Sequence, residues 1–157
     1  MTQPSLLVTA IGSERAGIQA LVAVLTEERN ALREGQLDRL VQFVPRKREL
    51  LLHIAHLGEQ RNRLLERGGV SADRRGMETW LTMHDAAGTV RADWQALLEL
   101  TRTAHDLNQE NGLYIDAGMR ANQQALQALM SAGAANSTYG PGGRSLSPLS
   151  SRTFASA

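Results

Sequence analysis

The amino-acid sequence predicts an all-α protein: an antiparallel helical hairpin packed with a long C-terminal helix in an elongated, coiled-coil-like bundle, followed by a flexible tail. Apolar residues recur at alternating intervals of four and three along most of the chain, and this spacing places side chains on one face of a helix. Aromatic residues make up only 4% of the 157 residues, which favours thin helical packing over a β-sandwich. The expected bundle covers residues 1–131, and a Gly/Ser-rich tail covers residues 132–157.

The composition argues against several classes of function. The chain has 17 basic and 16 acidic residues, so its net charge of +1 gives no field that would attract nucleic acid or an anionic membrane. It has no cysteine, which excludes disulfides and is compatible with a cytoplasmic location. The N-terminal segment lacks the basic region of a signal peptide, and no apolar stretch approaches the ~20 residues that span a bilayer. We therefore expect a cytoplasmic protein without membrane insertion.

Two helices of similar length are expected to form the hairpin. The first begins near Pro4 and Ser5 and ends at Gly35, a residue suited to a C-terminal cap. The second ends at residues 68–69 and contains Pro45, which predicts a kink or a late start of the helix there. Each helix has an apolar seam in steps of four and three. The seams comprise Leu7, Ile11, Glu14, Ile18, Leu21, Leu25, Glu28 and Leu32, and Leu40, Phe43, Lys47, Leu50, Ile54, Leu57, Arg61 and Leu64.

Charged residues inside the two seams predict the register of the hairpin. If two antiparallel helices turn near Gly35, the residue numbers of any two facing positions add up to the same value. One such value pairs both Glu14 with Arg61 and Glu28 with Lys47. A slip by one heptad would set charges opposite leucines, which disfavours other registers. The alternative is that each charged side chain extends to the edge of the seam and contacts water.

A third helical segment and a long last helix complete the expected fold. Ser71 and Asp73 are suitable caps for the start of the third segment, and Gly88 predicts a break after it. The last helix is expected from about Thr89 to about Ser131, which corresponds to roughly 60 Å. Because the hairpin arms are only ~45 Å long, the far end of this helix is expected to extend past them.

The second half of the last helix has an unusual composition. Its seam is apolar at the ends and rich in asparagine in the middle, which is unsuited to a sealed core. After Asp116 it has no acidic residue, and Arg120 is its only charge before Ser131. Neutral amides and alanines allow another helix to approach without desolvation of charges, and methionine adapts to varied partners. We therefore expect this face to meet a partner.

No group of residues in the sequence indicates catalysis, a metal or a cofactor. His53 and His56 are three residues apart, but neither has the carboxylate three residues before it that di-iron helical bundles use. No glycine-rich phosphate loop follows a strand. The short basic clusters at residues 46–48 and 74–75 are interpreted as solvated helix faces, because a nucleic-acid surface would need more basic residues and interleaved aromatic ones. We expect neither an enzyme nor a nucleic-acid-binding protein.

Residues 107–130, LNQENGLYIDAGMRANQQALQALM, followed by a Tyr-Gly turn, resemble the FlgN family of flagellar export chaperones. The resemblance extends over most of the chain, and Lys47 and Arg61 match a lysine and an arginine of the family's second helix. Its most specific part lies in the C-terminal helix, including the pair Asn108 and Asn111. The proline inside the second helix and the glycine-rich tail depart from the family pattern.

The resemblance implies a cytoplasmic chaperone of flagellar type III secretion. Its clients would be the hook-associated proteins of the hook–filament junction, which it would keep unpolymerised and deliver to the export gate. It also implies that the C-terminal helix captures the client, and we expect it to hold an amphipathic terminal helix in a groove. The expected client-binding residues are Asn108, Asn111, Ile115, Met119, Asn122, Leu126 and Leu129.

Alternatives stay open for this face and for the tail. Ile115, Met119 and Leu126 would be equally suited to packing on the chain's own hairpin. A structural or adaptor coiled-coil protein that forms a homo-oligomer through the same helix would show the same pattern. In the tail, Tyr139 is followed by glycine and proline and resembles a short docking element for the flagellar export apparatus, although a lone tyrosine in a loop is also often incidental.

Overall fold

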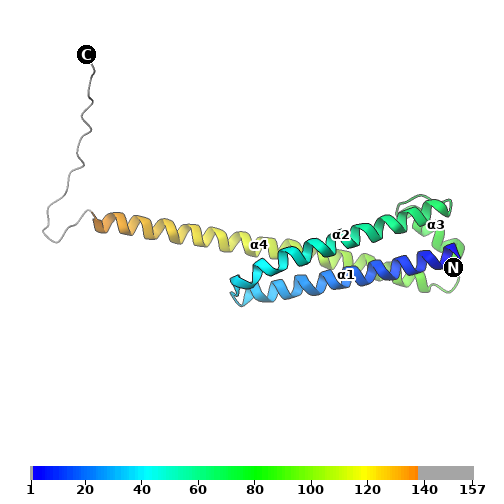
Figure 1. Ribbon diagram of the computed structural model, residues 1–157, viewed down its shortest axis with the longest axis horizontal. Coiled ribbons are helices and arrows are strands. Elements are labelled where there is room, and N and C mark those ends of the chain that lie inside the picture. The colour runs from blue at the N-terminus through cyan, green and yellow to red at the C-terminus, as the bar shows by residue number, and fades with distance from the viewer. Residues whose placement is uncertain (1, 138–157) are drawn as a thin grey trace, which may run out of the picture. The chain divides into compact units, whose positions relative to one another are not determined.

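The computed structural model describes residues 2–137, which form four α-helices without strands. The helices are α1 (Gln3–Arg33), α2 (Leu37–Arg67), α3 (Arg74–His84) and α4 (Thr89–Ser137) (Figure 1). The predicted all-α class, with a hairpin and a long last helix, is confirmed. Contacts between residues divide the chain into an N-terminal unit, residues 1–115, and a C-terminal unit, residues 116–157, with the boundary inside α4.

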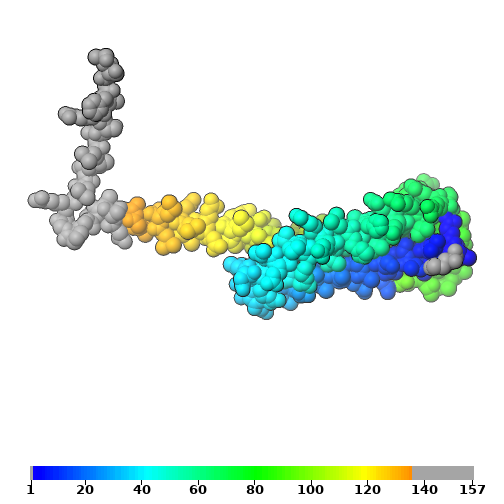
Figure 2. Space-filling model, in the orientation of Figure 1, coloured from blue at the N-terminus to red at the C-terminus, as the bar shows by residue number. Residues whose placement is uncertain are grey.

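The two arms of the hairpin, α1 and α2, lie side by side and antiparallel (Figures 1 and 2). Gly17 allows them to approach closely, because a Cβ atom added there would lie 3.2 Å from Ile54 Cγ1. α2 begins at Leu37 and passes through Pro45, so the helix does not start late at the proline. Phe43 explains this start: it is 2% exposed and packs with residues of α1, which holds the turns before Pro45 in place.

Each arm of the hairpin ends in a turn that uses a glycine with positive φ. At the end of α1 the Gln36 N–H donates to the Ala31 carbonyl at 2.9 Å, and Gly35 has a φ of 68°. Gly69 makes the equivalent turn after α2, with a φ of 76°. Residues with a side chain rarely adopt this conformation, so these two glycines end the helices where the sequence predicts.

The main core of the N-terminal unit combines the seam of α1 with apolar residues of the other helices. Its members are Leu7, Ile11, Ile18, Leu21, Leu25, Leu65, Met77, Trp80, Leu81, Val90, Trp94, Leu97 and Ala104. Ion pairs add to this packing at the surface: Arg15 of α1 contacts Asp93 of α4 at 2.5 Å, and Arg29 contacts Glu110. The first half of α4 is thereby held against α1.

α1 is the one described helix that is long and apolar enough to cross a membrane by length and composition. Glu14 and Arg15 interrupt its apolar residues, so it holds no continuous apolar stretch of the ~20 residues that span a bilayer. The apolar residues of α1 have another explanation, because Leu7 and Ile11 are buried in the core of the hairpin. Glu14 and Glu28 lie buried on the same face and form ion pairs with α2. A helix in the core of a folded unit has this composition without spanning a bilayer.

The short helix α3 begins at a cap that the sequence predicts. The Asp73 carboxylate accepts from the Gly76 N–H at 2.7 Å and from the Ser71 hydroxyl at 2.6 Å. These bonds, the one from Ser71 foremost, lower the pKa of Asp73 from its ordinary value. Gly76 is required here, because an added Cβ would lie 1.7 Å from the Ser71 carbonyl oxygen. After α3 the chain turns at Gly88, with a φ of 72°, as predicted.

The side chains of α4 change from partly buried to fully exposed along the helix. All side chains from residue 116 to residue 135 are exposed. α4 continues past the expected end near Ser131 to Ser137, because alanines at 132, 134 and 135 have high helix propensity. Tyr139 and the rest of the expected tail beyond Ser137 lie outside the described residues. The buried residues of the first half are Val90, Trp94, Leu97, Ala104 and Asn111.

Candidate functional site

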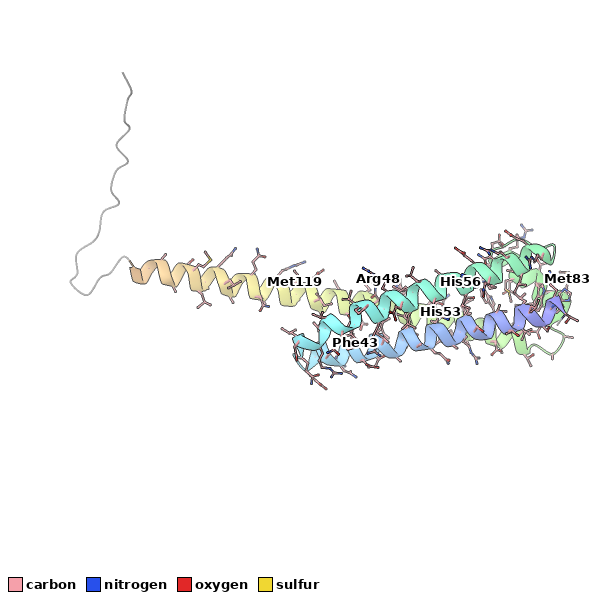
Figure 3. All side chains as sticks on the ribbon, in the orientation of Figure 1. Phe43, Arg48, His53, His56, Met83 and Met119 are labelled. Carbon is pink, nitrogen blue, oxygen red and sulfur yellow. The ribbon has the colours of Figure 1, made fainter. Side chains whose placement is uncertain are left out.

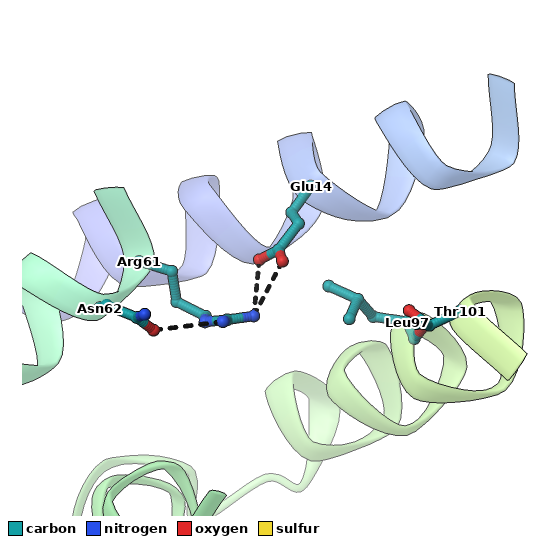
Figure 4. A network of polar contacts seen from close by, with 5 residues as sticks. All are labelled: Glu14, Arg61, Asn62, Leu97 and Thr101. Carbon is teal, nitrogen blue, oxygen red and sulfur yellow. Dashed lines mark hydrogen bonds and ion pairs between the residues drawn. The ribbon is translucent and has the colours of Figure 1, made fainter. Parts of the chain in front are cut away.

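One of the two predicted ion pairs joins the middle of α1 to the end of α2. Arg61 Nη1 donates to both carboxylate oxygens of Glu14, at 2.8 and 2.9 Å, which confirms the predicted pair (Figure 4). Arg61 also donates to Asn62 Oδ1 at 3.2 Å, and its guanidinium lies 5.0 Å from the centre of the Trp94 ring. Burial raises the pKa of Glu14 above its ordinary value, against the lowering effect of Arg61. The pair therefore contributes more to register than to net stability.

The second predicted ion pair lies near the turn of the hairpin and includes a residue of α4. Lys47 Nζ donates to Glu28 Oε1 at 2.7 Å, as predicted. Asn111 Nδ2 donates to Glu28 Oε2 and to the Leu25 carbonyl, both at 2.9 Å. Glu28 and Asn111 are 2% and 1% exposed. One buried carboxylate thus connects α2 and α4 to α1.

The seven residues predicted to bind a client lie in different surroundings. Asn111 is buried and hydrogen-bonded within the chain, Ile115 is half-buried, and Asn108 is exposed near α2. The other four belong to the C-terminal unit and are all exposed. They are Met119, Asn122, Leu126 and Leu129.

These four residues form a stripe on one face of the C-terminal unit, which we call the neutral stripe. Their spacing of three, four and three places them on the same side of α4. Met119, Leu126 and Leu129 are 66%, 61% and 70% exposed, and together they give this side of α4 an apolar row. Arg120 is the only charge between residues 117 and 131. The neutral stripe can therefore bury apolar surface against a partner without desolvating a charged group.

A groove in the N-terminal unit was not anticipated from the sequence. Two adjoining hollows, of about 290 and 460 Å³, lie along α2, and both are lined by Lys47, Leu51 and Asn108. The larger share of their lining is apolar. A second apolar repeat in α2, which includes Val44 and Leu51, was the signal that could have revealed this groove.

The described residues do not form a metal site, and two members of the basic cluster at residues 46–48 are paired with acidic side chains. Within residues 2–137 no three His, Asp or Glu side chains are grouped closely enough to hold a metal ion. His53 and His56 both lie exposed on α2 (Figure 3), and His56 is hydrogen-bonded to Gln60 at 2.9 Å. In the basic cluster at residues 46–48, Arg46 forms an ion pair with Glu27 at 3.0 Å. His56 and Arg46 are thus used in contacts within the N-terminal unit.

Most of the chain is similar to proteins of one known family. The model of the FlgN protein family matches residues 1–147. The flagella synthesis protein FlgN of Salmonella typhimurium (strain LT2) is 31% identical over 111 residues, which is 69% of each chain, and the values for FlgN of Salmonella typhi are the same. The crystal structure of a candidate flagella synthesis protein FlgN from Pseudomonas aeruginosa matches with a TM-score of 0.64 and 25% identity, over 83% of this chain and 97% of that chain.

Proposed function

Because this chain belongs to the FlgN family of flagella synthesis proteins, we propose that it is a cytoplasmic export chaperone for hook-associated proteins. In this function it binds the terminal helix of a client, prevents early polymerisation and delivers the client to the flagellar type III export gate. The observation that carries the proposal is the exposed neutral stripe of Met119, Asn122, Leu126 and Leu129. An amphipathic client helix is the kind of partner that such a stripe suits.

The energetics of the neutral stripe support binding of a helix. Fully burying a Leu or Met side chain contributes about 1.5–3 kcal/mol. The three apolar residues of the stripe together offset much of the ~4–15 kcal/mol that association costs in lost freedom of motion. Asn122 lies among them, and a buried amide in a helical seam favours the one register in which it finds a hydrogen-bond partner. Affinity would then come from Met119, Leu126 and Leu129, and register from Asn122.

The burial of Asn111 refines the set of proposed contacts. Its side-chain amide already donates to Glu28 and to the Leu25 carbonyl, so we infer that Asn111 stabilises the N-terminal unit and does not bind the client. The proposal for client binding rests on the four residues of the neutral stripe. Asn108 and Ile115 stay predictions from the sequence.

The proposal is tested by adding charge to the neutral stripe. Leu126→Asp combined with Leu129→Asp is expected to weaken binding to the C-terminal helix of a hook-associated protein by about 100-fold or more, since two buried leucines are replaced by carboxylates. A matched control is Ala121→Asp combined with Gln124→Asp, which adds the same charges at the same spacing on the opposite face of α4. The control is expected to bind normally. Unchanged affinity of the first variant, with intact helicity, would remove the neutral stripe from the proposed mechanism.

The same stripe also favours a second candidate function, that of an adaptor which self-associates through α4. An exposed row of Leu and Met residues without acidic charge is complementary to itself as well as to a client. Light scattering with and without client distinguishes the two functions. A chaperone is expected to form a complex with its client at the expense of any dimer, whereas a tight dimer that excludes the client would favour the adaptor.

A further inference from the structure

α2 has two apolar repeats, and α1 covers only one of them. The first repeat includes Phe43 and Leu57, which are buried in the hairpin. The second has the same spacing of four and three but faces another direction, and its large apolar residues are 54% to 76% exposed. A helix with two apolar faces usually contacts two partners. The second repeat comprises Leu37, Val41, Val44, Arg48, Leu51 and Ala55.

Val44, Arg48 and Leu51 of the second repeat line the groove described above, which we call the α2–α4 groove. Leu21 and Leu25 of α1 contribute to its lining, and Thr101, His105 and Asn108 come from the first half of α4. These residues come from three helices, α1, α2 and α4. From Val44 to Ile54 the lining of α2 extends over roughly 15 Å, or about three helical turns.

The two charged residues that line the α2–α4 groove, Lys47 and Arg48, are both basic, and the lining residues of the two hollows include no Asp or Glu. His105, also in the lining, contacts its neighbour Asp106 at 3.4 Å. Lys47 is already paired with Glu28. Within residues 2–137 Arg48 has no ion-pair partner, and the side-chain amide of Asn108 has no hydrogen-bond partner. Arg48 lies on the exposed side of α2 (Figure 3).

We propose that the α2–α4 groove binds an amphipathic helix of another protein, with acidic residues along the edge of its apolar face. The apolar face would cover Val44, Leu51 and the exposed part of Ile54, and a carboxylate at its edge would pair with Arg48. Asn108 is placed to bond with a polar group of the same helix, because it contributes to both hollows. This site is separate from the neutral stripe, and it does not depend on the proposed chaperone function.

Segments of this chain itself match the groove less well than an acidic helix does. The neutral stripe of a second copy has no acidic residue after Asp116, so it offers no partner to Arg48. Residues 138–157 contain Arg144 and Arg152 but no Asp or Glu. Charge complementarity therefore favours a partner protein over the chain's own segments.

The test uses the full chain and two designed helical peptides of about 18 residues. The peptides share one apolar face and differ only at its edges, which carry glutamate in one peptide and lysine in the other. By fluorescence anisotropy the glutamate peptide is expected to bind at least about tenfold more tightly. Leu51→Asp is expected to weaken its binding by about tenfold or more, and Arg48→Glu to reverse the preference between the peptides. Arg63→Glu, an exposed charge change on α2 away from the groove, is the matched control.

Leu126→Asp separates this site from the neutral stripe, because it is expected to leave the affinity for the glutamate peptide unchanged. Leu51 is 54% exposed, so Leu51→Asp is expected to keep the helical content and thermal stability of the parent chain. Equal affinity for both peptides, or binding lost in Leu126→Asp but kept in Leu51→Asp, would overturn the proposal. So would absence of binding, or a dimer of the chain that dissociates in Leu51→Asp, since a second copy would then fill the groove.

Discussion

Asn111 Nδ2 lies 2.9 Å from Glu28 Oε2, although the two residues are 83 positions apart in the sequence. Lys47 occupies the other oxygen of the same carboxylate. Glu28 is almost fully buried, and a buried carboxylate is tolerated only when it is paired and hydrogen-bonded. The position of the first half of α4 on α1 is therefore tied to the same charge that sets the register of the hairpin.

The first prediction separates the two asparagines that share the seam of α4. Asn111→Ala is expected to lower the free energy of unfolding by about 1–3 kcal/mol, because it removes two buried hydrogen bonds, and to leave the client affinity of the folded protein unchanged. Asn122→Ala, at an exposed position, is expected to weaken client binding and to leave the free energy of unfolding unchanged. Urea unfolding and client binding measured on both variants check this. Weaker client binding by Asn111→Ala at unchanged stability would contradict the assignment.

The second prediction concerns the ion pair of Glu14 and Arg61. Arg61→Met leaves a buried carboxylate without its partner and is expected to cost about 3–5 kcal/mol of stability. Adding Glu14→Leu to that variant removes the unpaired charge, so most of the lost stability is expected to return. Chemical denaturation of both single variants and the double variant gives the coupling energy. Additive losses would show that the pair does not act as a unit.

The third prediction is a dependence of stability on pH. Burial raises the pKa of Glu14 in the folded protein, so the folded state binds this proton more tightly than the unfolded state. The contribution of Glu14 is therefore fully present below its unfolded pKa and is lost as the pH rises through its folded pKa. As the pH rises from about 3 to 7, the free energy of unfolding of the parent chain is expected to decrease relative to that of Glu14→Gln.

Asp73 provides the opposite control for this dependence. The Ser71 hydroxyl and the Gly76 N–H lower the pKa of Asp73, so its contribution is present above its unfolded pKa and is lost as the pH falls through its folded pKa. Comparison of the parent with Asp73→Asn over the same range is expected to give a slope of opposite sign. Slopes of the same sign for both residues would contradict the assigned causes.

The fourth prediction compares two glycines inside helices of the N-terminal unit. Gly76→Ala is expected to destabilise the protein by about 1–3 kcal/mol or more, because its Cβ would lie 1.7 Å from the Ser71 carbonyl oxygen and the start of α3 would have to move. Gly12→Ala meets no atom within 4 Å and is expected to stabilise α1 by about 0.5–1 kcal/mol. Thermal unfolding measures both effects. A neutral Gly76→Ala would show that this turn is not required.

The fifth prediction concerns Tyr139, for which the sequence proposes docking to the export apparatus. Truncation after Ala135 is expected to leave client binding intact, because the neutral stripe lies before that point, and to reduce secretion of the client. Tyr139→Ala in the full chain is the finer variant and is expected to have the same effect on secretion. Loss of client binding on truncation would show that capture and delivery are not divided in this way.

Features that depend on local backbone chemistry or on a single pair of helices could be predicted from the sequence. Gly35 and Gly69 end their helices because the turn needs a positive φ, whatever lies around them. Glu14 and Glu28 interrupt apolar seams, and only one antiparallel register gives both a basic partner. Pro45 was a weaker guide, because the packing of Phe43 on α1 holds the helix together before the proline.

The sequence by itself thus determined the hairpin, its register and the glycine turns that end its two arms, because these follow from residue spacing and from charges that need partners. Only the tertiary structure decided which amides of α4 are buried. Asn108, Asn111 and Asn122 fall in one repeat, but Asn111 alone of the three is buried, because α1 presents Glu28 and the Leu25 carbonyl to it. The α2–α4 groove also depends on the tertiary structure. Whether a helix face is buried depends on the helices packed against it, and the residue pattern of that face alone does not fix this.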